Sequence, residues 1–353
     1  MDGCIGCSST GFSVGANDSG ALFDVVIGKR RLKIRIAAAA LEAARRSRAD
    51  AERTLTALVK QQYVQTVMAK VALDFARETA SSTAETFRLI DLRFREGALS
   101  EADSARAETA KLEAEQAVSA AEQALEAAKA SLAFLLGARD GPLPEFRVDE
   151  SLPKFTIPEI VVRTPPADFY RLGSERRPDL AAARAQVESA RAALDLAKRQ
   201  RIPDFQTGIQ YAQLGDGQNA IQPPTLSIGL SFGLPLFYRQ KGEIQKAEAA
   251  LRTEELLRDK IEAQVVSDVT TALASQAAAR QQVERMERRL LDRARRGRDL
   301  VEFQYRNGAA SLLELLDAQR TWIATNAEYR QGLTNFWTAL FSLEQAVGME
   351  LRP

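Results

Sequence analysis

Residues 199–242 read RQRIPDFQTGIQYAQLGDGQNAIQPPTLSIGLSFGLPLFYRQKG, and here a chain of helical patterns changes to a period of two. From residue 226 the even positions are large and apolar, whereas the odd positions between them are serine or glycine. The large residues are Leu226, Ile228, Leu230, Phe232 and Leu234. This alternation predicts a strand with one apolar face and one face of small residues.

A second strand is predicted just upstream, where residues 205–211 alternate less cleanly. Between the two runs lie glycine, asparagine and a Pro-Pro pair, which are typical of a turn region. Two strands of about ten residues have the length needed to cross a bilayer within a β-barrel. An open sheet edge cannot face lipid, so this interpretation requires further strands from the chain or from other subunits. The alternative is a soluble hairpin lying on a helical domain.

The composition removes several classes of function. The formal net charge is only +1 with both signs interspersed, so no basic stripe indicates nucleic-acid binding. The chain has no histidine, and Cys4 and Cys7 form a C-x-x-C without a second pair or a surrounding βαβ pattern. We therefore expect no metal site, no cofactor and no catalytic constellation. No apolar segment of signal-peptide length follows Met1.

Long helices account for most of the chain. No proline or glycine lies between Gly28 and Gly97, which predicts about 100 Å of helix at 1.5 Å per residue. No helical stretch is apolar enough to cross a membrane. The predicted divisions are an irregular N-terminus with a remnant strand (1–27), a first helical hairpin (28–141), a Pro-rich linker (142–178), a short helix (179–202), a β-hairpin (203–238) and a second helical hairpin (239–353).

The two helical hairpins repeat at a separation of 211 residues. Phe94–Ser100 aligns with Tyr305–Ser311 without a gap, and Gly97 thereby aligns with Gly308. In the first return helix seven alanines follow steps of three and four, which predicts a heptad seam in close antiparallel packing. They are Ala107, Ala110, Ala114, Ala117, Ala121, Ala124 and Ala128. The second return helix, 312–346, has no stacking partner, so we expect an N-terminal segment to be missing from the chain.

Together with this repeat, four short motifs resemble those of the TolC family of outer-membrane efflux ducts. They are Arg177-Pro178-Asp179-Leu180, Ile202-Pro203-Asp204-Phe205, Leu234-Pro235-Leu236-Phe237, and Tyr305-x-x-Gly308-x-x-Ser311 followed by Leu315-x-Asp317-Ala318. The resemblance covers roughly residues 22–348, and the Gly28-Lys29-Arg30-Arg31 start suggests the heavy-metal, CzcC-like branch.

The resemblance implies a mainly α protomer with long antiparallel coiled-coil helices in two repeats and a transmembrane-type β-hairpin. Three protomers would share a twelve-stranded barrel in outer-membrane lipid and an α-barrel that extends into the periplasm. The helix tips would dock onto a periplasmic adaptor (membrane fusion) protein fed by an inner-membrane RND-type pump. Such a duct is passive and needs neither a cofactor nor enzymatic chemistry; heavy-metal cations are one cargo that the branch suggests.

Site residues follow from the same resemblance. The tips at Gly97 with Ser100 and at Gly308 with Ser311 would be the adaptor-docking ends. Glu314 and Asp317 stand where the family places its acidic periplasmic gate, with Asp103 as the first repeat's equivalent of Glu314. Tyr305 and Arg306 are candidates for a latch on that gate. The alternative for the two acids is an ordinary solvated helix start. Trp322 and Trp337 are interpreted as packing residues, and Lys29 as a solvated or interfacial charge.

A rival interpretation is a periplasmic coiled-coil adaptor or scaffold protein. An adaptor is expected to carry a compact β module of short strands around one helical hairpin, whereas this chain has two hairpins and one long strand pair. Three copies of a chain with two or three strands supply six to nine strands, which is fewer than the twelve of the family's barrel. We therefore expect the chain by itself to be a fragment that does not conduct.

Overall fold

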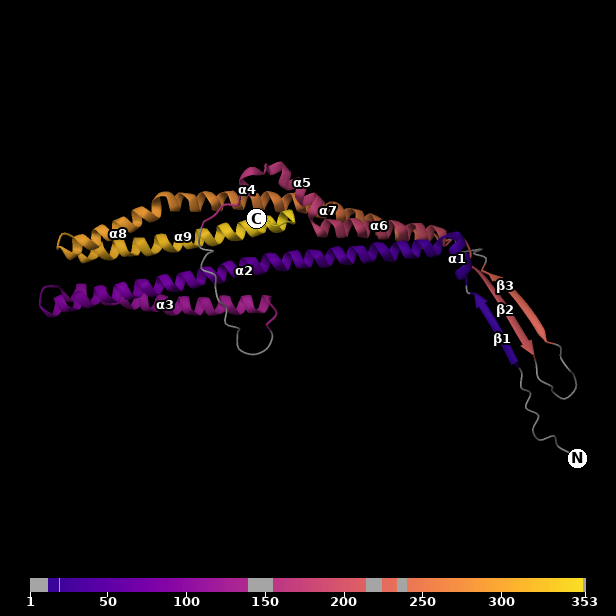
Figure 1. Cartoon of the computed structure of the whole chain (residues 1–353), viewed down its shortest axis with the longest axis horizontal. Helices are drawn as coiled ribbons and strands as arrows, with labels where there is room; N and C mark the ends of the chain where they lie inside the picture. Colours follow the sequence, from indigo (N-terminus) through magenta and orange to yellow (C-terminus); the bar gives the residue numbers. More distant parts are fainter. Residues whose placement is uncertain (1–11, 19, 139–154, 214–223, 234–239, 352–353) are drawn as a thin grey trace, which may run out of the picture. The chain divides into compact units, whose positions relative to one another are not determined.

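The computed structural model describes residues 12–18, 20–138, 155–213, 224–233 and 240–351 (Figure 1). The chain divides into two compact units, one of residues 1–48 with 178–262 and one of residues 49–177 with 263–353. Two long helices, α2 (Lys29–Arg95) and α7 (Lys241–Arg285), contribute to both units. Each unit is built from segments that lie far apart in the sequence.

The first unit holds an antiparallel sheet in the order β1 (Phe12–Asp18), β2 (Phe205–Gln213) and β3 (Thr225–Phe232). Its register pairs Val14 with Tyr211 and Ile209 with Ile228. The predicted hairpin and the remnant N-terminal strand are therefore both confirmed. Strand β1 pairs with β2, although about 190 residues separate the two strands along the chain.

Helices α1 (Ala21–Ile27) and α6 (Pro178–Arg199) complete the first unit. The sequence predicted an irregular segment up to residue 27, and α1 corrects this. Glycines in the left-handed region stop the helix at both ends, with φ of 98° at Gly20 and 81° at Gly28. The Phe23 ring then packs edge-on against Phe205, with centroids 4.4 Å apart, which joins α1 to the sheet.

The second unit holds the tips of the two helical hairpins. Helix α3 (Glu101–Leu135) returns along α2, and α9 (Leu312–Val347) returns along α7, the π-helical turn η1 (Met286–Leu290) and α8 (Leu291–Arg306). The sequence analysis placed this region in the second helical hairpin (239–353), and η1 interrupts the first arm of that hairpin with one π-helical turn. Val283 and Met286 are buried in this region, and a Cβ on Gly332 of α9 would lie 3.4 Å from Val283. Both side chains, three residues apart on one helical face, thus pack against α9 where the π-helical turn begins.

Two short helices, α4 (Glu159–Arg163) and α5 (Pro166–Arg176), lie where the sequence predicted only a linker; residues 139–154 of that linker are outside the described residues. Gly173 of α5 lies against Val265 and Val269 of α7, where an added Cβ would approach to 3.1 Å. The prolines of this stretch start helices instead of preventing them, because Pro166 occupies the first turn of α5.

The predicted alanine seam is only partly buried. Ala107 is buried, but Ala117 and Ala124 are exposed, and α3 buries Leu125 and Leu132 instead. The seam therefore does not form a continuous interface within the chain. None of the described helices combines the length and the apolar character needed to cross a membrane.

Candidate functional site

The sheet exposes one apolar face. Leu226, Ile228 and Leu230 are 65%, 77% and 64% exposed, although each is a large hydrocarbon side chain. The opposite face of β3 carries serine and glycine, as predicted. The Phe232 ring lies tilted against Phe205, with centroids 5.4 Å apart, and ends the apolar row in the described sheet; Leu234 lies outside the described residues. A soluble surface rarely carries such a continuous patch, so this face needs an apolar environment.

Strand β1 widens this face, which the sequence alone did not predict. Val14 and Phe12 are exposed, and the register places Val14 opposite Tyr211 and Ala16 opposite Ile209. Phe12, Val14 and Ala16 alternate with serine, glycine and asparagine, a period of two that the sequence analysis overlooked. The apolar face is therefore three strands wide in the described sheet.

Lys29 anchors the sheet to the start of α2. Its side chain is only 3% exposed, and its Nζ donates to the Ile202 carbonyl at 2.7 Å and to Asp204 at 2.5 Å. The interpretation of Lys29 as a solvated charge is therefore wrong. The Ile-Pro-Asp-Phe motif supplies both acceptors immediately before β2, which fixes where the strand leaves the helical part of the first unit.

The two hairpin tips have the same backbone. Gly97 and Gly308 adopt left-handed φ of 76° and 77°, and Ser100 and Ser311 cap the helices that follow. The Ser100 hydroxyl accepts from the Asp103 amide at 3.2 Å, and the Ser311 hydroxyl accepts from the Glu314 amide at 3.3 Å. The repeat found in the sequence is therefore a structural repeat at its tips.

Glu314 completes a capping box at the second tip. Its carboxylate accepts from the Ser311 backbone N–H at 2.7 Å and from the Ser311 hydroxyl at 2.9 Å. These bonds, the backbone bond first, hold the pKa of the Glu314 carboxyl below its usual value. Asp317 lies one turn further along α9 and lines an open cavity with Arg106, Arg320 and Glu314.

The other predicted gate residues are not brought together as one ionic cluster. Asp103 pairs with Arg106 of its own helix at 3.1 Å, and Arg306 pairs with Glu302 at 2.6 Å. The Tyr305 ring lies under the Arg93 guanidinium at 5.7 Å, and its buried hydroxyl finds no hydrogen-bond partner among the described residues. Within one described chain, neither latch candidate bonds to Glu314 or Asp317.

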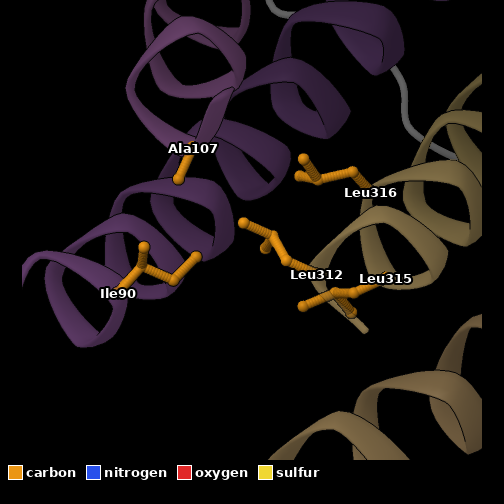
Figure 2. Close-up of a cluster of buried hydrophobic side chains, with 5 residues drawn as sticks. All are labelled: Ile90, Ala107, Leu312, Leu315 and Leu316. Carbon is orange, nitrogen blue, oxygen red and sulfur yellow. The ribbon is translucent and has the colours of Figure 1, made fainter. Parts of the chain in front are cut away.

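An apolar cluster joins the two tips instead (Figure 2). Its buried members are Ile90 of α2, Ala107 of α3, and Leu312, Leu315 and Leu316 of α9. Figure 2 shows the three leucines turned toward the α2/α3 hairpin. The sequence analysis missed this cluster, although leucines three and four apart directly after a capping serine are the pattern of a buried helix start.

No site for a metal ion is apparent in the described ranges. No three His, Cys, Asp or Glu side chains gather closely enough there to hold one. Cys4 and Cys7, the C-x-x-C of the sequence, lie outside the described residues. Trp337, interpreted as a packing residue, is buried between Phe336 and Phe341, with ring centroids 5.2 and 6.2 Å away.

Sequence comparison then decides the family. The model of the protein family described as "Outer membrane efflux protein" matches residues 6–138 and 170–349. The chain belongs to the outer membrane efflux protein family. The match spans both helical hairpins and all three strands, so the TolC-family resemblance and the mainly helical fold class are confirmed. This family consists of efflux channels of the outer membrane and not of enzymes.

Individual family members agree with this assignment. The chain is 26% identical over 308 residues to the pyoverdine export outer membrane protein OpmQ of Pseudomonas aeruginosa, covering 84% of this chain and 62% of OpmQ. It is 21% identical over 324 residues to the cobalt-zinc-cadmium resistance protein CzcC of Cupriavidus metallidurans, covering 91% and 74%. The chain thus spans less than two thirds of the length of OpmQ.

Solved structures of membrane channels and other membrane proteins share the fold. A membrane protein from Pseudomonas aeruginosa superimposes with a TM-score of 0.79 at 21% identity, covering 97% of this chain and 83% of that one. CusC superimposes with a TM-score of 0.78 at 17% identity and the same coverage. At these identities the likeness concerns the fold alone.

Proposed function

We propose that this chain is a duct subunit of a tripartite efflux system in the outer membrane, extending into the periplasm. The observation that carries the proposal is the exposed apolar face of the three-stranded sheet, backed by small residues. Apolar-out and small-or-polar-in alternation suits a strand between lipid and an aqueous interior. Family membership supplies the context of outer-membrane efflux.

The open edges of the sheet indicate that the chain associates with further copies of itself. Strands β1 and β3 each leave an edge that no described strand covers, and lipid does not tolerate such edges. A homotrimer would pair them between subunits. The periplasmic adaptor and the inner-membrane pump would meet the Gly97 and Gly308 tips, where Glu314, Asp317 and Asp103 are the acidic gate candidates. The gate and docking roles rest on the family resemblance.

The cargo is a separate matter. The relatives are named for pyoverdine export and for cobalt, zinc and cadmium resistance, which are chemically unlike cargos. A passive duct takes its cargo from the pump that feeds it. Heavy-metal cations therefore remain one option that the CzcC-like start and the 21% identity to CzcC support.

Lipid contact of the sheet can be tested one residue at a time. In a background with Cys4→Ser and Cys7→Ser, Ile228→Cys carries an environment-sensitive dye on the apolar face, and Ser227→Cys carries it on the opposite face. In vesicles reconstituted with the purified chain, we expect lipid-chain quenchers to reach the dye at 228 and not at 227. Equal quenching at the two positions, or none at either, would contradict the proposal.

A second measurement addresses conduction. Native mass spectrometry reports whether three copies associate, and planar-bilayer recording reports whether they conduct. The strand count of the sequence analysis predicts that this chain alone gives no stable conductance. An adaptor or scaffold would show no dye burial at residue 228, and the described β structure is a three-stranded sheet instead of a compact module of short strands.

A further inference from the structure

A groove separates the two hairpins of the second unit, just beyond the tip cluster. It has a volume of about 470 Å³ and is lined by α2, α3 and α9. Leu316 belongs to the tip cluster and closes one end, and Arg330 lies at the other. Along α9 these residues are about 21 Å apart, at 1.5 Å per residue. The volume falls within the range of pockets that enclose small molecules.

The walls of the groove are mostly apolar. Phe75 and Ala72 come from α2, Ala114 and Ala117 from α3, and Ile323 from α9. Ala114 and Ala117 belong to the seam that the sequence predicted to be closely packed, yet Ala117 is exposed. Apolar side chains thus line a groove that no described segment of the chain fills.

Arg330 is the unusual member of this lining. Its guanidinium lies 4.4 Å from the Phe75 ring centroid and is partly buried, and burial lowers the pKa of the side chain. No hydrogen bond or ion pair to this guanidinium comes from the part of the chain that the structure describes. A guanidinium keeps its charge and carries five N–H donors, so burying it without an anion is unfavourable.

The carboxylate that lines the groove in the described part of the chain does not pair with that charge. Among the described lining residues the acidic side chain is Glu113, which lies 4.0 Å from Arg320 in a largely exposed pair. Other arginines near the groove have different arrangements; Arg298, for example, pairs with Asp299 at 2.5 Å while lying over Trp322. Arg330 therefore stands as a partly buried cation at the end of an apolar groove, without an ionic partner in the described part of the chain.

We propose that this groove binds a small amphipathic anion, a molecule with one carboxylate or sulfonate head and a hydrocarbon body. The head lies on the Arg330 guanidinium, where charge-assisted hydrogen bonds use donors that Phe75 cannot satisfy. The body lies along the alanine wall toward Leu316 and takes apolar surface out of water. The proposal does not rest on the proposed function, because the groove lies within the second unit, whereas the sheet that carries the proposed function belongs to the first.

Two pairs of variants test charge and shape separately. Arg330→Gln removes the head-group partner, and its control Arg280→Gln removes an arginine of α7 that already pairs with Glu284 at 2.8 Å. Ala117→Phe fills the groove, and its control Ala124→Phe places the same ring one heptad further along α3, outside the lining residues. Circular dichroism checks that all four variants keep the helical content of the parent chain.

The measurement is isothermal titration calorimetry of the purified chain with decanoate below its micelle concentration, with the uncharged amphiphile octyl glucoside as comparator. We expect Arg330→Gln to weaken decanoate binding about tenfold, as losing a hydrogen bond between charged groups does. Ala117→Phe should abolish binding, whereas the two controls should match the parent chain. Octyl glucoside should bind Arg330→Gln and the parent alike.

Three results would overturn the proposal. One is that the parent chain shows no decanoate binding. Another is that each variant behaves as its control does, which would place decanoate on another apolar surface such as the sheet. The last is that Ala117→Phe changes the mass of the particle in sedimentation instead of its affinity for decanoate. That result would identify the occupant of the groove as a second copy of the chain.

Discussion

The two hairpin tips share a backbone but differ in side-chain chemistry. Gly97 and Gly308 have φ values within one degree of each other, and a serine three residues later caps each return helix. At the repeat separation, however, Ser104 stands where the second tip has Leu315, and Asp103 stands where it has Glu314. The repeat thus preserves the turn, while the leucines of the apolar cluster and the full capping box belong to the second tip.

The largest expected difference concerns Leu315, which is 1% exposed in the tip cluster. Leu315→Ala should lower the free energy of local opening by about 3 kcal/mol, because truncating a buried leucine loses transfer free energy and leaves a cavity. Hydrogen exchange of the amides flanking Gly308 measures this. The matched change Ser104→Ala should have an effect near zero, and equal effects at the two positions would contradict the asymmetry.

The shared backbone predicts a pair of equal effects. Gly308→Ala and Gly97→Ala each force a β-carbon into the left-handed region, although an added Cβ would touch nothing within 4 Å at either site. Each should cost about 1 to 2 kcal/mol from conformation alone. Hydrogen exchange at the two tips reports both values, and a difference larger than about 1 kcal/mol would show that the tips are not equivalent turns.

Several of these features could be predicted from the sequence. Alternation at residues 226–232 gave the two-faced strand, because a half-buried strand imposes a period of two on its side chains. The tips followed from the repeat, since glycine is needed where φ is positive. Contacts between distant segments left no local signal. The pairing of β1 with β2, the burial of Lys29 by Ile202 and Asp204, and the π-helical turn at Met286 all depend on tertiary contacts.

The gate candidates show the same limit. Sequence position identified Glu314 and Asp103 as equivalents, and both do lie at helix starts. A glutamate is long enough to return to the backbone N–H of its capping serine, whereas Asp103 accepts from the Ser100 hydroxyl at 2.7 Å and pairs with Arg106. The ordinary helix-start role, which was the alternative for Glu314, is thus what its bonds in one chain support.

Acid should therefore affect the second tip through Glu314. Its pKa is depressed in the folded chain below 4.5, so its stabilising contribution is present above the unfolded pKa and is lost as pH falls through the folded one. We expect amide exchange at residues 311–315, corrected for intrinsic rates, to accelerate below about pH 4.5. Glu314→Gln should remove that dependence. An unchanged pH profile in this variant would mean that another group causes it.

The smallest effect is expected at Tyr305, where the first repeat has Phe94. The buried Tyr305 hydroxyl has no partner within the described chain, so Tyr305→Phe removes an unsatisfied polar group and keeps the ring against the tip cluster. Amide exchange at the second tip should stay the same or slow slightly, which corresponds to a rise of less than about 1 kcal/mol in the free energy of local opening. If the variant instead loosens the tip once copies of the chain associate, the hydroxyl bonds to a neighbouring subunit, as a latch between protomers requires.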